Sequence, residues 1–458
     1  MALTSVHTCA YLLVIAMSAL SVSSAGKVVC PCKTKDGCVR PNRMKSTDKE
    51  VFIVTNGTAD YRSWEWDSLT SVIATETNLN TDVMCFAHQM HKKYGFMVHL
   101  DYKAANSNSS STTWVDSIVS RRNSSHADFV SVKLMNVLKT KDASIVQKVN
   151  KILLALKSAL TPKIHYGHPI EMVCVVPWKP ACYGGDCTIT QDTLYHACDW
   201  IMIDPSSFEY QHEGSGCQAR ATVPFTMISL GVDEYASFGI NEERVILGIP
   251  WHGYKYNCKD FTFRMDLSKC TLKEVKSEGS NTSHCDVAGS REMISVGELL
   301  DKHQDQLTTA YWNKAYKAPM FDHCTSNMSN CHQYWYENIH SLRLKYQYAH
   351  DFGLKGIAIY FAEDLSKSNT PANTGFTGGM WDWVLHGILQ TTVKQPPPVK
   401  YHADVVAGAA IGCLLLGLVL GVLFTCLGLR HRVKKKPGAP FKRDRQVEYH
   451  DEDDDLNL

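Results

Sequence analysis

Phe129-Val130-Ser131-Val132-Lys133-Leu134-Met135 is a short run in which apolar residues occupy every second position. Successive side chains of a β-strand point to opposite faces, so Val130, Val132 and Leu134 share an outer apolar face and the other four residues point inward. The stretch 146–160 (VQKVNKILLALKSAL) follows it and has the spacing of an amphipathic helix. Together the two stretches predict one strand-helix unit.

Seven further short apolar runs predict strands, and stretches with helical spacing lie between several of them. Alternation of strand and helix is typical of a parallel sheet, and eight such units predict an α/β fold with a closed (β/α)8 barrel of the triosephosphate isomerase type. The eight runs are Val51–Thr55, Ser71–Thr75, Phe96–Leu100, Phe129–Met135, Glu171–Trp178, Trp200–Asp204, Arg244–Trp251 and Gly356–Phe361. The helical stretches include Val83–Tyr94, Val146–Leu160 and Val232–Phe238.

The gap between the seventh and eighth runs, about residues 252–355, is too long for a loop and predicts a small inserted module. The barrel with this insertion is expected to occupy residues 26–393. The chain has 458 residues, so segments remain at both ends.

Those end segments predict export and membrane anchoring. Residues 1–25 contain an apolar stretch followed by small residues, which is typical of a cleaved signal peptide. Val405–Leu429 is apolar, carries no charge and precedes a basic cluster, which predicts a transmembrane helix with a cytosolic carboxyl end. We therefore expect a single-pass type I protein with a Pro-containing stalk at 394–404, a cytosolic tail at 430–458 and an ectodomain at the cell surface or in the lysosome.

Cysteines and glycosylation sequons agree with export. Of 17 cysteines, fourteen lie between the two apolar segments and predict several disulfides, although their pairing cannot be derived from the sequence. A zinc site at Cys30, Cys32 and Cys38 is a weaker alternative, because a second pair of ligands is missing. Five sequons predict N-glycosylation, at Asn56, Asn108, Asn123, Asn281 and Asn327.

Two further features bear on partners. A net charge of +1 with 20% charged residues excludes a nucleic-acid binder that works by bulk charge. Small residues spaced by four within the apolar segment are compatible with a homodimer of transmembrane helices: Gly408, Gly412, Gly417 and Gly421. We expect no metal and no cofactor.

Several stretches resemble family-18 glycoside hydrolases and, within that family, the lysosomal di-N-acetylchitobiases. They are MCFAH (84–88), IPWHGYKYNC (249–258), HQYWYENIHSLRLK (332–345) and GIAIY (356–360), and they follow the family's order across the ectodomain. The resemblance implies a barrel with an insertion between strands seven and eight, acting on N-acetylglucosamine-containing glycans.

The resemblance breaks at the chemistry. The family carries Asp-Gly-x-(Asp or Asn)-x-Asp-x-Glu on the fourth strand, in which Glu is the general acid and the preceding Asp orients the substrate's acetamido nucleophile. Here only Asp128 remains, while Ser131, Lys133 and Met135 take the places of the other acidic or amide residues. A thioether has no proton to donate, so the sequence predicts loss of hydrolysis. Because a buried unpaired ammonium is costly, we expect Asp204 or Asp101 beside Lys133, or an open, solvated site.

Other candidate residues lie at the ends of later strands. The family's Met-x-Tyr-Asp on strand six is Met202-Ile203-Asp204-Pro205 here, and its stacking Trp on the last strand corresponds to Tyr360. Glycan-binding candidates are Trp178, Asp204, Trp251 and Tyr360, with core or rim packing an equal alternative for the two tryptophans. Glu363 and Asp364 are candidates for a relocated acid, although a solvated loop pair is the favoured interpretation.

These observations leave three function classes. An inactive, chitobiase-like membrane glycoprotein would bind N-acetylglucosamine-type glycans or a protein partner. An adhesion or scaffold protein would bind no glycan, and an active glycosidase would need the relocated acid. The fold does not choose among them.

Overall fold

A computed structural model of the protein describes residues 30–38, 49–57, 60–75, 79–138, 142–161, 170–181, 194–206, 217–263, 268–276, 283–326, 330–364, 371–384 and 388. All of them belong to one compact unit that extends to Gln395. The predicted signal peptide, stalk, transmembrane segment with its four glycines, and tail lie outside the described residues. No helix within the described ranges is long and apolar enough to span a bilayer.

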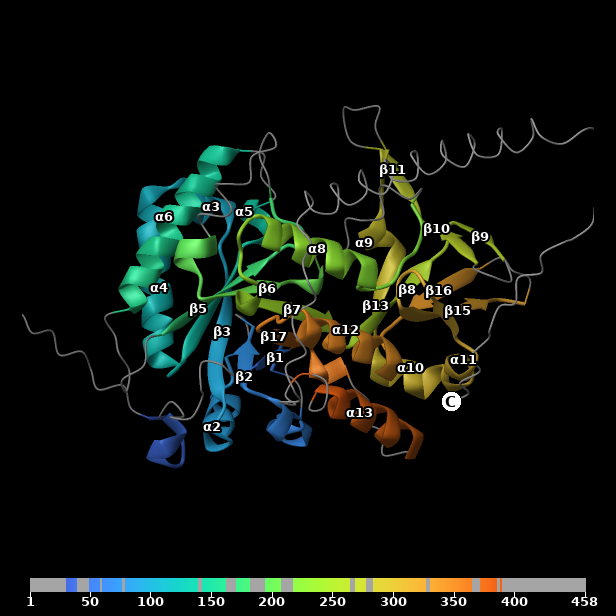
Figure 1. Cartoon of the computed structure of the whole chain (residues 1–458), viewed down its shortest axis with the longest axis horizontal. Helices are drawn as coiled ribbons and strands as arrows, with labels where there is room; N and C mark the ends of the chain where they lie inside the picture. Colours follow the sequence, from blue (N-terminus) through green and yellow to red (C-terminus); the bar gives the residue numbers. More distant parts are fainter. Residues whose placement is uncertain are drawn as a thin grey trace, which may run out of the picture. The chain divides into compact units, whose positions relative to one another are not determined.

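Eight parallel strands form a closed barrel in the order β1-β17-β7-β6-β5-β4-β3-β2 (Figure 1). Each strand lies within or overlaps one of the eight predicted runs, so the predicted (β/α)8 barrel is confirmed. The strands are β1 (Glu50–Thr55), β2 (Ser71–Ala74), β3 (Lys93–His99), β4 (Phe129–Lys133), β5 (Glu171–Val176), β6 (Trp200–Ile203), β7 (Val245–Pro250) and β17 (Gly356–Tyr360).

Burial on both faces explains why these strands contain so many apolar residues. Every residue of β1, β2, β7 and β17 is buried, as expected for parallel strands covered outside by helices and filled inside by side chains. The interior cluster includes Phe52, Met97 and Phe129, whereas Val130 and Val132 belong to the outer cluster. The barrel is therefore a packed core, with its chemistry at the strand ends.

The helices begin at capping residues that the sequence supplies. Asn80 accepts hydrogen bonds from the backbone amides of Asp82 and Val83 at the start of α2, and Asp142 caps α6. The helices are α2 (Thr81–Gln89), α3 (Tyr102–Asn106), α4 (Asn108–Ser124), α5 (Met135–Leu138), α6 (Ala143–Leu160), α8 (Phe225–Ser237), α9 (Val287–Ser290), α10 (Val296–Lys302), α11 (Gln304–Thr308), α12 (Ile339–Asp351) and α13 (Pro371–Val384). Short 3-10 helices are η1 (Lys35–Cys38), η2 (Tyr61–Ser63), η3 (Trp66–Ser68), η5 (Glu242–Arg244) and η6 (Ala362–Asp364).

The segment between β7 and β17 is the predicted insertion. It contains a five-stranded antiparallel sheet in the order β13-β8-β16-β15-β14 and two two-stranded ribbons, β10-β9 and β11-β12 (Figure 1). Its strands are β8 (His252–Asn257), β9 (Asp260–Thr262), β10 (Lys269–Thr271), β11 (Glu274–Lys276), β12 (Ser283–Cys285), β13 (Arg291–Ser295), β14 (Tyr311–Asn313), β15 (Ala318–Cys324) and β16 (Cys331–Trp335).

Disulfides join cysteines throughout the described residues, as predicted. The pairs are Cys30–Cys38, Cys32–Cys85, Cys174–Cys198, Cys217–Cys285, Cys258–Cys270 and Cys324–Cys331. The zinc alternative at Cys30, Cys32 and Cys38 is wrong for this state of the chain, because sulfur in a disulfide is not the thiolate that zinc requires.

Candidate functional site

The carboxyl ends of the barrel strands form the candidate site, and β4 supplies its centre. The predicted alternation holds along this strand: Phe129 is fully buried in the interior cluster and packs edge-on against Phe52, with ring centroids 5.6 Å apart. A methyl group on Gly95 of β3 would lie 2.5 Å from the Phe129 ring. Glycine at that position therefore makes room for the phenylalanine inside the barrel.

Lys133, the last residue of β4, forms an ion pair with Asp204, which directly follows β6. The Lys133 Nζ lies 2.5 Å from the Asp204 Oδ2, and the side chains are 21% and 0% exposed. Asp204 Oδ1 also accepts the backbone N–H of Ser206. The predicted partner of Lys133 is thus confirmed as Asp204, whereas Asp101 caps α3 through the backbone N–H of Ala104 at 2.7 Å. The ion pair places an ammonium where the family's pattern places a carboxylate.

Met135 differs from the prediction. Strand β4 ends at Lys133, and Met135 is the first residue of α5, so the alternation that made it an inward-facing strand residue stops two positions earlier. The backbone N–H of Leu134 still bonds Val175, but its carbonyl accepts the N–H of Leu138 and begins the helix. Met135 is buried, 5% exposed. Its thioether offers no proton in either position.

Ser131 lies in the middle of β4, and Asp128 directly precedes the strand. Ser131 is fully buried, and its Oγ has no hydrogen-bond partner among the described residues. Asp128 lies at the amino end of β4, opposite Lys133, where its Oδ2 lies 3.0 Å from the His88 Nε2 and accepts the Tyr94 backbone N–H at 2.9 Å. The retained acidic residue of the motif thus joins α2 and β3 to β4, which is a structural role far from the carboxyl ends.

Tyr360 ends β17 and is 5% exposed within the interior cluster. Its hydroxyl donates to the Met202 Sδ at 3.6 Å. Burial, reinforced by the charge of Asp204, raises the pKa of Tyr360 well above its usual range, so its hydroxyl stays protonated. Tyr360 is therefore a neutral hydrogen-bonding group at the end of β17.

The two tryptophan candidates pack differently. Trp178 is partly buried, and a methyl group on Gly231 of α8 would meet its ring at 3.1 Å, so the ring lies against that helix. Trp251 is fully buried, donates from Nε1 to the Tyr346 hydroxyl at 2.9 Å and packs edge-on against Trp381. The geometry of Trp251 matches the packing alternative.

Glu363 and Asp364 lie in η6, directly after Phe361, and are not a solvated loop pair. Glu363 Oε1 accepts from the Thr55 hydroxyl and from the Asn56 backbone N–H at 3.0 Å, and its buried Oε2 has no partner within the described residues. Burial raises the pKa of Glu363, and the nearby charge of Asp364 acts in the same direction. Asp364 lies 3.1 Å from the His252 Nδ1.

Sequence reasoning missed this seam between the first and last barrel strands. β1 and β17 are neighbours in the closed barrel, so Thr55 and Glu363 meet although they are 308 residues apart. Closure of the barrel could have predicted this contact, because it requires the ends of the first and last strands to be adjacent.

The sequon residues lie in different parts of the chain. Asn56 lies at the seam, and Asn108 and Asn123 lie on α4. Asn281 and Asn327 fall outside the described residues.

Comparisons with known proteins agree with this geometry. No protein-family model matches the chain. The di-N-acetylchitobiase of Homo sapiens is 25% identical over 366 residues, covering 79% of this chain and 89% of that protein. The rat enzyme is 26% identical over 357 residues, covering 77% and 91%.

Solved chitinases share the fold. A class V chitinase from Nicotiana tobaccum, solved as a mutant in complex with NAG4, has a TM-score of 0.53 at 12% identity, covering 74% of this chain and 99% of that one. A chitinase from Rhizomucor miehei has a TM-score of 0.54 at 16% identity, covering 73% and 100%. The resemblance seen in the sequence is confirmed: the chain is similar in sequence to the di-N-acetylchitobiases and shares its fold with the chitinases.

Proposed function

We propose that this chain is a membrane-anchored, chitobiase-like glycoprotein that does not hydrolyse glycans and whose ectodomain binds N-acetylglucosamine-type glycans. The observation that carries the proposal is the ion pair between Lys133 and Asp204. Hydrolysis in this family needs a proton donor and a carboxylate that orients the acetamido group. Lys133 replaces the orienting carboxylate and also forms an ion pair with Asp204. In that ion pair the Asp204 carboxylate neutralises Lys133 and does not orient an acetamido group.

The loss of general acid help alone costs about 10² to 10⁴ in rate, and loss of the oriented nucleophile adds to that cost. Met135 has no proton to give, and Ser131 carries a neutral hydroxyl. The residues at three separate positions of the motif, Ser131, Lys133 and Met135, thus each favour loss of hydrolysis.

Glycan binding is supported by the shared fold and by the remaining polar and aromatic groups. A related barrel binds NAG4. At the carboxyl ends of this barrel we propose the partly buried Trp178 and Lys133, whose side chain is 21% exposed, as glycan contacts. Asp204 is fully buried and would act by holding Lys133, and Tyr360, at 5% exposed, would offer only its edge. Trp251 would act indirectly, by holding the end of β7 against α12 and α13.

A chromogenic chitobioside assay tests the loss of hydrolysis. Purified full-length protein is compared with a heat-denatured sample and with a Ser131→Asp, Lys133→Asp, Met135→Glu variant, from acidic to neutral pH. We expect no turnover by the native protein. Turnover above the denatured control would overturn the proposal, whereas activity in the triple variant alone would support an intact sugar site that lacks its chemistry.

A glycan array tests binding. We expect the protein to retain N-acetylglucosamine oligomers and to lose them when free oligomer competes. No binding by protein that unfolds cooperatively would favour the adhesion or scaffold class instead.

One observation favours a second candidate function, an active glycosidase with a relocated acid. Glu363 is a partly buried carboxyl with a raised pKa, and its buried Oε2 has no partner among the described residues. These are properties of a general acid. If the native protein turns over chitobioside, Glu363→Gln should abolish that turnover, and Asp204→Asn is the next variant to test.

Export and anchoring are supported by the apolar segments at 1–25 and 405–429 and by the five sequons. Protein expressed in a secretory cell should gain mobility after treatment with an N-glycosidase and should stay in the membrane during alkaline extraction. Five unmodified sequons, or release by alkali, would overturn this part of the proposal.

A further inference from the structure

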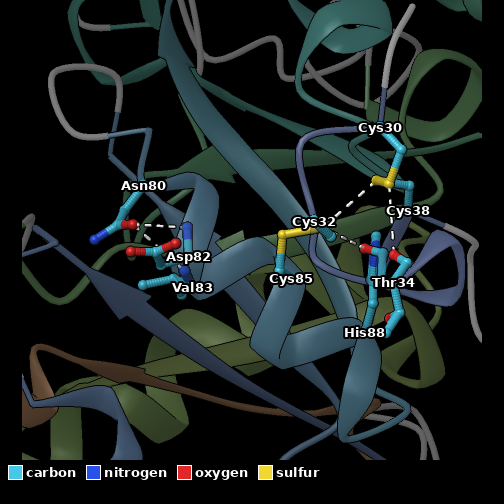
Figure 2. Close-up of a disulfide and its surroundings, with 10 residues drawn as sticks. Cys30, Cys32, Thr34, Cys38, Asn80, Asp82, Val83, Cys85 and His88 are labelled. Carbon is cyan, nitrogen blue, oxygen red and sulfur yellow. Dashed lines mark hydrogen bonds between the residues drawn. A yellow bond between two sulfur atoms is a disulfide. The ribbon is translucent and has the colours of Figure 1, made fainter.

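Two disulfides lie in contact at the amino-terminal end of the described chain (Figure 2). Cys30 pairs with Cys38, and Cys32 pairs with Cys85 on α2. The Cys38 Sγ lies 3.4 Å from the Cys32 Sγ, although these two sulfurs are not bonded to each other. The sulfur atoms of Cys30, Cys32 and Cys38 all lie within 4.8 Å of one another.

We propose that this cluster is a thiol-disulfide exchange site that takes a small thiol as co-substrate and passes the exchange from the first disulfide to the second. A thiolate replaces one sulfur of a disulfide through a mixed disulfide, so two disulfides whose sulfurs touch can exchange partners. The 3.4 Å separation matches the 3 to 3.5 Å approach typical of positioned reacting atoms.

Accessibility sets which sulfur of the first disulfide is attacked. Cys30 is partly exposed, whereas Cys38 is 6% exposed, so an external thiol attacks this bond at the Cys30 sulfur. Cys32 and Cys85 are also partly exposed, so direct attack on the second disulfide is the competing route that the experiments below separate from the relay. Lys33 and Lys35 are exposed in the same segment. Their positive charges favour the approach of an anionic thiol.

The exchange balances without an oxidant or a reductant. The external thiolate bonds to Cys30, and the Cys30 to Cys38 bond breaks, leaving a Cys38 thiolate. That thiolate bonds to Cys32, the Cys32 to Cys85 bond breaks, and Cys85 takes up the proton that the external thiol lost. The products are a mixed disulfide at Cys30, a Cys32 to Cys38 disulfide and a Cys85 thiol.

The exchange would release the amino-terminal segment from the barrel. The Cys32 to Cys85 disulfide ties residues 30–38 to α2, whereas the new disulfide lies wholly within the segment. A remaining link is the 2.8 Å contact between the His88 Nδ1 and the Gly37 carbonyl. His88 itself stays attached to Asp128. Reaction with an external thiol would therefore remove the covalent link between residues 30–38 and α2.

The test treats native full-length protein with reduced glutathione, blocks free thiols with an alkylating reagent and maps the cysteines by mass spectrometry. Trypsin leaves Cys30 and Cys32 on one peptide and separates them from Cys38 and Cys85, because Lys33 and Lys35 lie between. We expect alkylated Cys85, glutathione on Cys30 and a Cys32 to Cys38 link, with fragmentation at Pro31 distinguishing the two cysteines. Glutathione on Cys32, or alkylated Cys38 with the Cys32 to Cys85 disulfide intact, would overturn the proposal.

A variant pair gives an independent rate test. In Cys30→Ser/Cys38→Ser the first disulfide is absent, so Cys85 becomes free only by direct attack, and we expect its appearance to slow at least tenfold. The matched control, Cys324→Ser/Cys331→Ser, removes a disulfide from the inserted sheet and should leave the rate unchanged. Equal rates in native protein and the first variant would refute the relay. Mapping of the native protein decides the question if the first variant fails to fold.

Discussion

The ion pair between Lys133 and Asp204 predicts an unequal response to loss of its two partners. In Lys133→Met, the Asp204 carboxylate stays fully buried but loses its counter-charge. In Asp204→Asn, the Lys133 ammonium loses its partner but keeps contact with water, because its side chain is 21% exposed while that of Asp204 is 0% exposed. The lysine substitution should therefore be the more damaging of the two.

The magnitudes follow from these exposures. Breaking a buried ion pair by removing one partner typically costs about 3 to 5 kcal/mol, and access of water to Lys133 favours the lower end, about 3 kcal/mol for Lys133→Met. Asp204→Asn leaves a solvated ammonium and keeps an amide that can hold the Ser206 N–H, so we expect a cost of about 1 kcal/mol. The double variant should cost less than the sum of the two, by about 1 to 3 kcal/mol.

Urea unfolding followed by tryptophan fluorescence at pH 7 measures all four proteins. The ion pair does not stabilise the fold as described if both single variants have free energies of unfolding within about 0.5 kcal/mol of the native protein, as substitutions at exposed positions do. The same holds if Asp204→Asn is the more destabilised of the two. Additive effects in the double variant would show that the two side chains do not interact.

Two further variants test the barrel interior and the seam. Gly95→Ala should lower the free energy of unfolding by about 1 to 3 kcal/mol, because its methyl group would overlap the Phe129 ring. In urea unfolding, adding Phe129→Leu to the same chain should recover part of that loss. If the effects of the two substitutions simply add, the contact between the two residues is contradicted. The pKa of Glu363 in the folded protein is raised above its ordinary 4.5, so its contribution to the free energy of unfolding is present below about pH 4.5 and is lost as the pH rises through the folded pKa. In Glu363→Gln this pH-dependent loss of stability should disappear when unfolding is measured from pH 4 to 8. The same pH profile in the variant and the native protein would contradict the raised pKa.

The barrel and the inserted module were predictable because their signals are local. Alternation in residues 129–133 and short apolar runs elsewhere reflect burial that each strand experiences by itself, and the length of 252–355 exceeds any ordinary loop. That Lys133 needs an acidic neighbour or water was predictable for a different reason, since an inward ammonium requires compensation and strand ends in a barrel converge. The sequence left Asp204, Asp101 and solvation open, and the structure selects Asp204.

The end of β4 and the seam were not predictable in this way. Alternation gives no sign of where a strand stops, and the hydrogen bond from Leu138 to the Leu134 carbonyl, which begins α5, is not encoded in the polarity of Met135. Glu363 looked like a loop residue because its partners, Thr55 and Asn56, stand at the other end of the chain. Contacts of that separation depend on the closure of the whole barrel.

Closure across β1 and β17 also has a consequence for synthesis. β1 is complete at Thr55, but the strand that covers its second edge is not made until Tyr360. At about 5 to 20 residues per second, the ribosome needs roughly 15 to 60 seconds to make the intervening chain. During that time an edge containing Val51, Phe52 and Ile53, each at most 1% exposed once folded, lacks its partner. Until Tyr360 is made, the nascent chain therefore carries an unpaired apolar strand edge, which is the kind of surface that pairs with other chains and aggregates.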